Sequence, residues 1–510
     1  MTEFTTVGNL LAAGGAGAPA IGAPGRATLD FAGLRALAER TVRDLNALGI
    51  GRGDRVAIVL PNGPEMATAF LAIACGATTA PLNPDYKAEE FEFYLSDLGA
   101  RALVVERGST SPAIAVAKKL NVPVHEISWG PDDPAGTFAL PAAGKGDTAT
   151  KAGMAEAGDV ALVLHTSGTT SRPKIVPLTQ GNVAASARHI ATTLALTPAD
   201  RCLNIMPLFH IHGLIAAVLS SVGAGAAVFC SPGFNALRFF GWMDEVHPTW
   251  YTAVPTMHQA ILARAERNAE IIGRNPLRFV RSSSSSLPPQ VMAELERVFG
   301  APVIEAYGMT EAAHQMASNP LPPNPRKPGT VGIPAGPDIA IMAMDGKLLA
   351  RGETGEIVIR GPNVTPGYEA NAKANAEAFT NGWFRTGDQG VMDAEGYLAI
   401  TGRLKEIINR GGEKISPREV DEVLLDHEAV GQVVTFAMPH PKLGEEVAAA
   451  VVLREGKACT ENELREFARK RLAEFKVPRK ILFVAEIPKG ATGKLQRIGL
   501  AEKLGLGAGA

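Results

Sequence analysis

Residues 165–174 combine the residue types that hold phosphate groups. They read His-Thr-Ser-Gly-Thr-Thr-Ser-Arg-Pro-Lys and follow an apolar run, 159–164, that predicts a buried strand. Glycine lets the backbone approach a ligand closely, the hydroxyl groups supply hydrogen-bond donors, and Lys174 adds a positive charge. The Walker A pattern GxxxxGK[ST] is absent from this position. The residues alone therefore allow either a polyphosphate-binding loop of another fold or an ordinary Gly/Ser/Thr turn.

Four later segments carry further residues that could do chemistry. In chain order they are Glu-Ala-Tyr-Gly-Met-Thr-Glu over 305–311, Trp-Phe-Arg-Thr-Gly-Asp over 383–388, Gly-Arg at 402–403, and Pro-Lys-Gly-Ala-Thr-Gly-Lys over 488–494. Taken singly, Tyr307 is typical of a core aromatic residue, Asp388 of a turn and Lys494 of a solvated surface. Only their combination and order favour a site.

The composition indicates a multidomain soluble enzyme. The chain has 510 residues, of which 46% are hydrophobic and 20% charged, which is enough for more than one domain with a large core. A net charge of −2 argues against an extended nucleic-acid surface. The four cysteines are widely scattered, with no CxxC pair and no histidine at metal-ligand spacing. We therefore expect neither disulfides nor a structural zinc, in keeping with a reducing compartment.

Targeting and membrane signals are weak. The N-terminus has an early acid and no basic region, so we expect no signal peptide, and the C-terminus is not a peroxisomal tripeptide. Residues 213–237 contain no charge, but Gly223, Gly225, Pro232 and Gly233 interrupt them. The interruptions favour a buried helix followed by a strand over a membrane span. We expect a cytoplasmic protein without a membrane span.

The hydrophobic pattern predicts parallel βαβ units in the first hundred residues. Helices are expected over 34–48 (with Asp30 as N-cap), 65–75 and 87–98, and strands over 55–60, 77–82 and 102–105. The Pro/Gly-rich stretch 131–158 is expected to be a surface connection. Short strands such as 355–360 and 396–400 then predict a β-rich subdomain over about 331–402. A compact α+β pattern ends the chain, with helices over 416–426 and 461–475 and strands over 430–438 and 446–453.

The five motifs, in this order and over nearly the whole chain, resemble the core motifs of the adenylate-forming superfamily of acyl-CoA synthetases, adenylation domains and luciferases. The resemblance implies an α/β fold with a large N-terminal adenylation core (1–402), a hinge (403–405) and a small mobile C-terminal α+β domain (406–510). It implies a two-step reaction. A small carboxylate reacts with ATP to give an acyl-adenylate and pyrophosphate, and the acyl group then passes to the thiol of coenzyme A.

The resemblance also implies roles for individual residues. Thr310 would hydrogen-bond the α-phosphate, and Glu311 would bind Mg²⁺, which prefers carboxylate and phosphate oxygens. Tyr307 would stack on adenine, and Asp388 would accept hydrogen bonds from the ribose hydroxyls. The implied ATP-binding residues as a whole are Thr166, Ser167, Gly168, Thr169, Thr170, Lys174, Ser285, Ser286, Tyr307, Gly308, Asp388 and Arg403.

The C-terminal part is implied to serve the two half-reactions in turn. By resemblance, Lys494 enters the site during adenylation and bridges the carboxylate and the α-phosphate, and Lys405 is the hinge residue. Gly411 and Gly412 would line the channel for the pantetheine arm of coenzyme A. Five nearby cations either meet the nucleotide end of coenzyme A or form a solvated helix face: Lys470, Arg471, Lys476, Arg479 and Lys480.

The acid is suggested by the small-residue segment 282–286, which is five serines here, where relatives that act on fatty or aromatic acids place Gly and Ala. Buried hydroxyls favour a polar substrate, because an unpaired one costs roughly 1–3 kcal/mol. With 309–316 and 318–322, the block resembles oxalyl-CoA synthetases (oxalate–CoA ligases). Ser284 and His314 would hold the second carboxylate of oxalate, and His210, or its neighbour His212, would gate the acyl pocket. Many dicarboxylate sites use an arginine fork, and Arg281 is left unassigned because it lies inside the strand.

Three alternatives stay open. One is a CoA ligase for malonate, a short or medium-chain fatty acid, or a hydroxycinnamate. Another is a free-standing adenylation enzyme that loads a carrier protein. The third is a non-catalytic nucleotide-binding or scaffold protein, against which the presence of both Glu311 and Lys494 argues. The sequence does not indicate an oligomeric state.

Overall fold

The computed structural model describes residues 5–142, 148–166, 173–488 and 496–507. These residues form two compact units. The first contains the described residues of Met1–Thr166, Lys174–Ile339 and Ile359–Phe379, and the second contains Pro173 and the described residues of Ala340–Val358 and Thr380–Ala510. Most of the β-rich segment therefore groups with the C-terminal residues.

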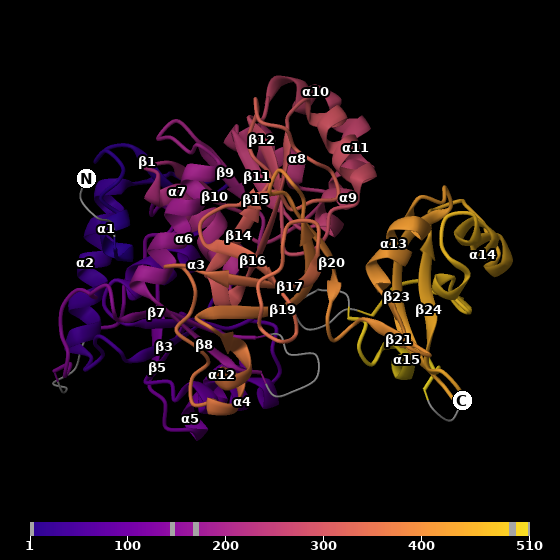
Figure 1. Cartoon of the computed structure of the whole chain (residues 1–510). Helices are drawn as coiled ribbons and strands as arrows, with labels where there is room; N and C mark the ends of the chain where they lie inside the picture. Colours follow the sequence, from indigo (N-terminus) through magenta and orange to yellow (C-terminus); the bar gives the residue numbers. More distant parts are fainter. Residues whose placement is uncertain (1–4, 143–147, 167–172, 489–495, 508–510) are drawn as a thin grey trace. The chain divides into compact units, whose positions relative to one another are not determined.

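A six-stranded sheet of the first unit confirms the predicted βαβ units (Figure 1). Its order is β6-β5-β3-β4-β7-β8, and every neighbouring pair is parallel except β7 and β8. The strands are β3 (Arg55–Val59), β4 (Thr78–Pro81), β5 (Ala102–Glu106), β6 (Val124–Ile127), β7 (Val160–His165) and β8 (Ile175–Thr179). The helices between them are α3 (Pro64–Ala74), α4 (Ala88–Leu98) and α5 (Pro112–Lys119). The N-cap prediction holds as well, because the Asp30 carboxylate accepts a hydrogen bond from Gly33 N at the start of α2 (Phe31–Ala47).

A nine-stranded sheet forms the other layer of the first unit, in the order β15-β14-β13-β12-β11-β9-β10-β1-β2. Its strands are β1 (Pro19–Gly22), β2 (Leu29–Asp30), β9 (Arg201–Asn204), β10 (Ala227–Cys230), β11 (Trp250–Ala253), β12 (Phe279–Ser282), β13 (Val303–Met309), β14 (His314–Ser318) and β15 (Ile333–Pro334). The associated helices include α6 (Gln180–Thr193), α8 (Phe239–Val246), α9 (Pro255–Ala265) and α11 (Pro289–Phe299). β9, β11, β12 and β13 run parallel, so their carboxyl ends meet at one edge.

The uncharged stretch 213–237 folds as predicted, as a buried helix followed by a strand. A π-helix, η1 (His212–Leu219), continues into α7 (Ser220–Gly223), and β10 follows. All eight residues of η1 are buried. Among the described residues, no helix has the length and apolar character needed to cross a membrane.

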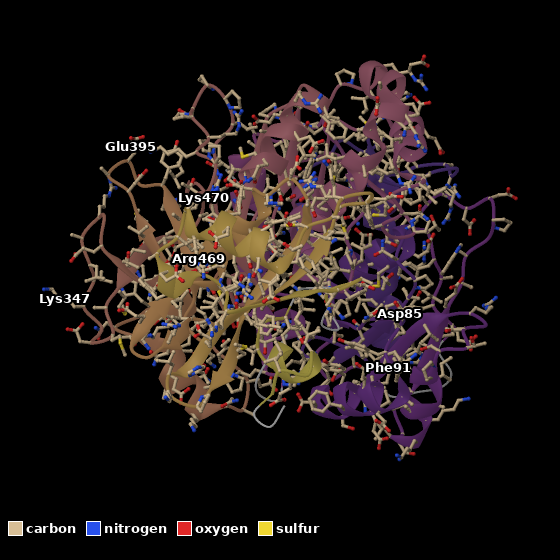
Figure 2. All side chains as sticks on the ribbon, turned by 90° about the vertical axis from the view of Figure 1, so that its right-hand side faces the viewer. Asp85, Phe91, Lys347, Glu395, Arg469 and Lys470 are labelled. Carbon is tan, nitrogen blue, oxygen red and sulfur yellow. The ribbon has the colours of Figure 1, made fainter. Side chains whose placement is uncertain are left out.

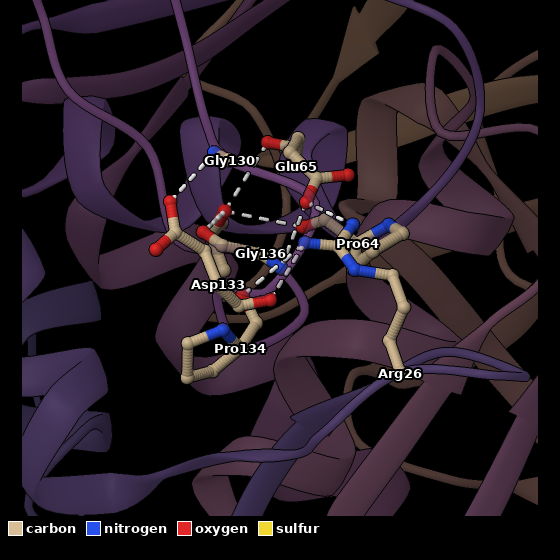
Figure 3. A network of polar contacts seen from close by, with 8 residues as sticks. Arg26, Pro64, Glu65, Gly130, Asp133, Pro134 and Gly136 are labelled. Atoms are coloured by element: carbon tan, nitrogen blue, oxygen red, sulfur yellow. Dashed lines mark hydrogen bonds and ion pairs between the residues drawn. The ribbon is translucent and has the colours of Figure 1, made fainter.

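The connection after β6 is more buried than the Pro/Gly pattern predicted. Ala135 is fully buried, and a polar network attaches its surroundings to the start of α3 (Figure 3). The Arg26 guanidinium lies 2.5 Å from the Glu65 carboxylate and donates to the Asp133 carbonyl, while Gly136 N donates to Glu65 at 3.0 Å. Surface exposure was therefore the wrong expectation for this part of 131–158, because the Glu65 carboxylate forms an ion pair and accepts a hydrogen bond from a backbone N–H, which the composition did not reveal.

The second unit contains two five-stranded sheets. In the first, β16-β17-β19-β18 form a path and β20 pairs with β19. These strands are β16 (Asp338–Met342), β17 (Thr354–Arg360), β18 (Phe379–Thr380), β19 (Trp383–Met392) and β20 (Leu398–Arg403). Residues 338–339 of β16, 359–360 of β17 and Phe379 of β18 group with the first unit. The second sheet contains β21 (Ile408–Arg410), β22 (Glu413–Ile415), β23 (Val430–His440), β24 (Gly444–Leu453) and β25 (Lys480–Phe483). α13 (Pro417–Leu425), α14 (Glu461–Arg469) and α15 (Leu500–Lys503) accompany it.

One helix is shorter than predicted. The helix expected over 461–475 ends at Arg469, and a separate 3₁₀ turn, η4 (Glu474–Lys476), follows. Leu464, Ala468 and Leu472 are all buried in the same core cluster. Because their apolar spacing of four continues across the helix end, periodicity could not reveal where the helix stops.

Candidate active site

The ends of β7 and β8 bring Thr166 and Lys174 together. The two strands are antiparallel and pair as far as His165 and Ile175. Thr166 N donates to the Lys174 carbonyl at 2.9 Å, and Lys174 N donates to the Thr166 hydroxyl at 3.1 Å. Both ends of the predicted phosphate loop are thereby held at one point, whereas Ser167, Gly168, Thr169 and Thr170 lie outside the described residues.

Tyr368 connects Lys174 with Glu311, and the sequence did not single it out. The Lys174 ammonium lies 4.3 Å from the centre of the Tyr368 ring, and the Tyr368 hydroxyl donates to Glu311 Oε1 at 2.8 Å. Burial, and after it the Glu311 charge, raises the pKa of the Tyr368 hydroxyl, so this hydroxyl remains a donor. The signal was weak because Tyr368 follows Pro-Gly, which reads only as a turn.

A tight hairpin between β13 and β14 positions the residues of the second motif. Gly308 pairs with Gln315, and a Cβ at Gly308 would lie 1.7 Å from the His314 carbonyl oxygen, so only glycine fits. Tyr307 is largely buried on β13, and Thr310 and Glu311 form the turn η3 (Thr310–Ala312). The hairpin presents the predicted adenine, phosphate and metal residues within five positions of one another.

The serine segment, residues 282–286, starts at the end of β12, and its members differ in burial and in hydrogen bonding. Ser282 and Ser283 are fully buried, and the Ser283 hydroxyl donates to the Ala306 carbonyl. Ser284 has a φ of +71°, in the left-handed region, and its hydroxyl lies 3.0 Å from His212 Nδ1. Ser285 is exposed and Ser286 is half-buried. Ser284 is thus the serine of this segment whose hydroxyl meets a histidine.

His212 and His314 form a stacked pair beside Ser284. Their ring centroids are 5.0 Å apart and their planes differ by 21°. His212, at the start of η1, also lies with Nε2 2.6 Å from the Thr252 hydroxyl on β11. His314 follows Ala313, and both have positive φ angles, 47° and 98°, which turn the chain into β14. The two histidines and Ser284 therefore come from three separate elements.

Arg281, which sequence reasoning left unassigned, contacts both histidines of this pair. Its guanidinium reaches His314 Nε2 at 3.1 Å and His212 Nε2 at 3.3 Å, and the side chain is fully buried. A charged residue inside an apolar strand pattern was the available signal.

His210 lies elsewhere in the same segment. It is half-buried, and its ring centroid is 4.5 Å from that of Phe209. The structure brings His212, not His210, into contact with Ser284. A gating role for His210 stays a prediction.

In the second unit, β19 and β20 pair Asp388 directly with Arg403. Arg403 Nε lies 2.9 Å from Asp388 Oδ1, and the Asp388 carboxylate is nearly buried while Arg403 is about half exposed. Asp388 N also donates to the Thr386 hydroxyl. The two predicted nucleotide residues of this unit thus form one ion pair.

The remaining predicted residues lie farther along the second unit. Lys405 is exposed in the turn after β20. Gly411 and Gly412, with φ of 59° and 102°, form the two-residue turn between β21 and β22, which requires positive φ at both positions. Lys494 lies outside the described residues.

The cations considered for coenzyme A differ in their surroundings. Lys476 pairs with Glu419 at 2.6 Å and Lys480 with Glu461 at 3.6 Å, while Arg471 covers the Phe467 ring. Lys470 follows Arg469 at the end of α14, where Figure 2 labels both. Two of the five cations are therefore neutralised by carboxylates.

The metal-binding prediction rests on Glu311 alone. Within the described ranges there is no group of three or more His, Cys, Asp or Glu side chains that could hold a metal. One carboxylate with the phosphate oxygens of a nucleotide is a common way to bind Mg²⁺, so the residues present fit such an ion when nucleotide is bound.

Comparisons with known proteins cover almost the whole chain. The family model described as AMP-binding enzyme matches residues 12–369, and that of the AMP-binding enzyme C-terminal domain matches residues 419–494. An oxalate–CoA ligase of Arabidopsis thaliana is 48% identical over 94% of this chain and 94% of its own length. An oxalate–CoA ligase of Saccharomyces cerevisiae is 43% identical over 88% and 87%. The crystal structure of ATP-bound MatB from Rhodopseudomonas palustris aligns with a TM-score of 0.88 at 30% identity, over 98% of each chain.

Proposed function

The chain belongs to the AMP-binding enzyme family, and on that premise we propose that it converts oxalate, ATP and coenzyme A into oxalyl-CoA, AMP and pyrophosphate. Membership makes it an AMP-forming acid–thiol ligase, which confirms the resemblance inferred from the motifs. The proposal adds the acid and an enzyme-bound oxalyl-adenylate. It is supported by two oxalate–CoA ligases among the relatives.

The observation that carries oxalate is the contact of Ser284 with His212, with His314 stacked on that histidine. In the family this segment borders the acyl group. An alkyl or aromatic acid would place carbon against these hydroxyl and imidazole groups and offer them no hydrogen-bond acceptor. The second carboxylate of oxalate accepts hydrogen bonds from hydroxyl and imidazole donors. A short, doubly charged acid therefore suits this lining better than a fatty or aromatic one.

For the nucleotide, the inferred roles follow the motifs. The loop between Thr166 and Lys174 holds the β- and γ-phosphates, and Thr310 binds the α-phosphate. Tyr307 stacks on adenine, and Asp388, oriented by Arg403, accepts hydrogen bonds from the ribose hydroxyls. The ATP-bound relative supports ATP as the nucleotide.

Mg²⁺ would be held by Glu311, whose carboxylate Tyr368 orients by its hydrogen bond. When bound, the ion would neutralise phosphate charge as the carboxylate approaches. Neutralisation is needed because both reacting groups are anions. Lys174 adds a protein cation to the same end of the site.

The C-terminal residues are proposed to act in sequence. Lys494 bridges the attacking carboxylate and the α-phosphate during adenylation, and Lys405 is the hinge that withdraws it. Gly411 and Gly412, whose positive φ angles exclude bulky side chains, then allow the pantetheine arm to approach. His210 is retained as a candidate gate of the acyl pocket.

The test is pyrophosphate release dependent on ATP and coenzyme A with oxalate, malonate, acetate, hexanoate and coumarate in turn. We expect the highest kcat/KM with oxalate, and chromatography should identify oxalyl-CoA as the product. A higher kcat/KM for hexanoate or coumarate would contradict the proposal. Pyrophosphate release without any acyl-CoA would instead favour an enzyme that loads a carrier protein, and the absence of release with every acid would favour a non-catalytic protein.

A further inference from the structure

Arg281 is a fully buried arginine whose hydrogen-bonding partners, within the described part of the chain, include no carboxylate. Nη1 lies 3.3 Å from His212 Nε2 and 3.4 Å from the Thr252 hydroxyl. Nη2 lies 3.1 Å from His314 Nε2 and 3.4 Å from Gln315 Oε1. The guanidinium Nε has no hydrogen-bond partner among the described residues. All its contacts are with neutral acceptors.

Several other arginines of this protein are paired with acids. Arg278, three residues earlier, contacts Asp200 at 2.9 Å, Arg385 contacts Glu356, and Arg497 contacts Asp421 at 2.6 Å. An unpaired buried charge is costly, and chains rarely retain one without a use. Burial lowers the pKa of Arg281 to about 9, so the side chain still carries its charge at neutral pH. Among the described residues, Arg281 thus carries its charge without a carboxylate partner, in contact with His212 and His314.

Guanidinium chemistry also determines where the histidine protons lie. Arginine only donates, so Nε2 of His212 and of His314 must each accept. Thr252 accepts from Arg281 and lies 2.6 Å from His212 Nε2, so the Thr252 hydroxyl and the more distant guanidinium share the single lone pair of that nitrogen. Both rings are then neutral with the proton on Nδ1, and His212 Nδ1 donates to the Ser284 hydroxyl. The proton of that hydroxyl is left to donate to another acceptor.

Two other titratable groups near Arg281 are neutral. Burial raises the pKa of the Cys202 thiol on β9 well above its usual value, so the thiol is neutral. Burial lowers the pKa of His258 on α9 to about 3, so it is neutral as well. Arg281 is the charged member of this set of contacts, whose other members are two imidazoles, a hydroxyl and an amide.

We propose that Arg281 is the positioning residue that sets acid specificity: it holds His212 and His314 as neutral Nδ1 donors and offsets the charge of an anionic group that the acid retains after activation. The inference rests on the proposed function, because it assigns the acyl side of that site. It names a chemical class, acids with a second anionic group close to the reacting carboxylate. An acid of similar size without that group lacks the electrostatic partner.

The first experiment compares oxalate with glyoxylate, which keeps one carboxylate and replaces the other by an aldehyde. In Arg281→Met, the ratio of kcat/KM for oxalate to that for glyoxylate should fall by about 100-fold, mainly through the KM of oxalate. Arg281→Lys, which keeps the charge, should retain most of the preference. Arg278→Met is the matched control, because it removes an arginine of the same strand region that pairs with Asp200. It should lower Tm and leave the ratio unchanged.

The split between KM and kcat separates this role from a merely structural one. Loss of the guanidinium should raise the KM for oxalate and leave the kcat and KM for glyoxylate close to their wild-type values, because glyoxylate lacks the second anionic group. Arg281→Gln provides the same test if Arg281→Met does not fold.

Equal losses with oxalate and glyoxylate would overturn the inference. An unchanged ratio in a folded variant would do so too. If the wild type uses malonate in place of oxalate, the proposed function fails but the inference does not. The comparison is then malonate against its monomethyl ester, and the inference stands only if Arg281→Met loses the preference for the dianion.

Discussion

At the residue scale, Ser284, His212 and His314 form a polar cluster whose members lie at strained backbone positions or at the ends of elements. Ser284 has a positive φ just after β12, His314 has one at the start of β14, and His212 begins a π-helix. Non-glycine residues in the left-handed region cost on the order of 1–3 kcal/mol each, and π-helical turns are rare. A fold that retains three such positions around one cluster is organised for those side chains rather than for its own stability.

Replacing Ser284 tests the serine that we assign to the acid. Ser284→Ala removes the hydroxyl at 3.0 Å from His212, and Ser284→Gly removes it while relieving the positive φ. Both should raise the KM for oxalate by about tenfold, the loss of one charge-assisted hydrogen bond, and Gly should not lower Tm. Ser283→Ala, which loses only a bond to the Ala306 carbonyl, serves as the control. A larger change in acid preference from Ser283 than from Ser284 would refute the assignment.

Tyr368→Phe tests whether Glu311 binds the metal. Without the hydroxyl at 2.8 Å, the carboxylate loses the group that orients it, and the Mg²⁺ concentration for half-maximal activity should rise by about tenfold. The KM for oxalate should change little. Tyr251→Phe, which removes another buried tyrosine hydroxyl of the first unit, is the matched control. If Mg²⁺ dependence is the same in both variants, Glu311 does not hold the ion through this arrangement.

Sequence reasoning reached the polar cluster only in part. Ser284 and His314 were predicted because their types suit a dicarboxylate, and the structure places both beside His212. Between His210 and His212, two residues apart, type and spacing cannot choose, and the burial of η1 decides which ring meets Ser284. Arg281 was left out because strand position alone does not tell a paired arginine from an unpaired one. That distinction depends on contacts with β11 and β14, which are remote in sequence.

At the element scale, the first βαβ units were predictable because their strands are short apolar runs and their helices have clear stripes and caps. α2 begins at its predicted N-cap, Asp30. The predictions that were wrong are those in which tertiary packing overrides the local sequence pattern. α14 stops at Arg469 although its apolar spacing continues, and the connection near Ala135 is buried by the ion pair of Arg26 with Glu65. A π-helix has no separate pattern of its own, so η1 could be predicted only as a buried helix.

Arg497 should be the residue that most stabilises the C-terminal sheet and its helices against each other. Its guanidinium lies 2.6 Å from Asp421 on α13 and 3.3 Å from Glu406, and it donates to the Thr435 carbonyl on β23. Arg497→Met leaves Asp421 buried without its partner, at a cost of about 3–5 kcal/mol. Urea unfolding followed by circular dichroism measures the loss. The exposed pair of Arg469 with Glu466 gives the contrast, because Arg469→Met should cost less than about 1 kcal/mol. Similar losses in the two variants would rule out this role.

At the scale of the whole molecule, the residues of the inferred reaction are distributed over both units. Ser284, Glu311 and Tyr368 belong to the first unit, and Asp388 and Arg403 to the second. The family and the general α/β class could be read from five ordered motifs, because each motif is local in sequence. The grouping of the described residues into two units could not be predicted from the sequence. Most of the β-rich segment 331–402 clusters with the C-terminal residues through contacts that periodicity does not reveal. The hinge at 403–405 accordingly stays a prediction about motion.

A separation of the two half-reactions tests that motion. If Lys494 acts only while the acid attacks ATP, Lys494→Ala should lower ATP–pyrophosphate exchange by about 100-fold or more, the usual loss when a group that stabilises the transition-state charge is removed. Transfer of the oxalyl group from chemically prepared oxalyl-adenylate to coenzyme A should be nearly unchanged. Lys503→Ala, which removes an exposed lysine of α15, should affect neither step. Equal losses in both half-reactions would mean that Lys494 stays in the site throughout, and a hinge at Lys405 would then have no catalytic lysine to withdraw.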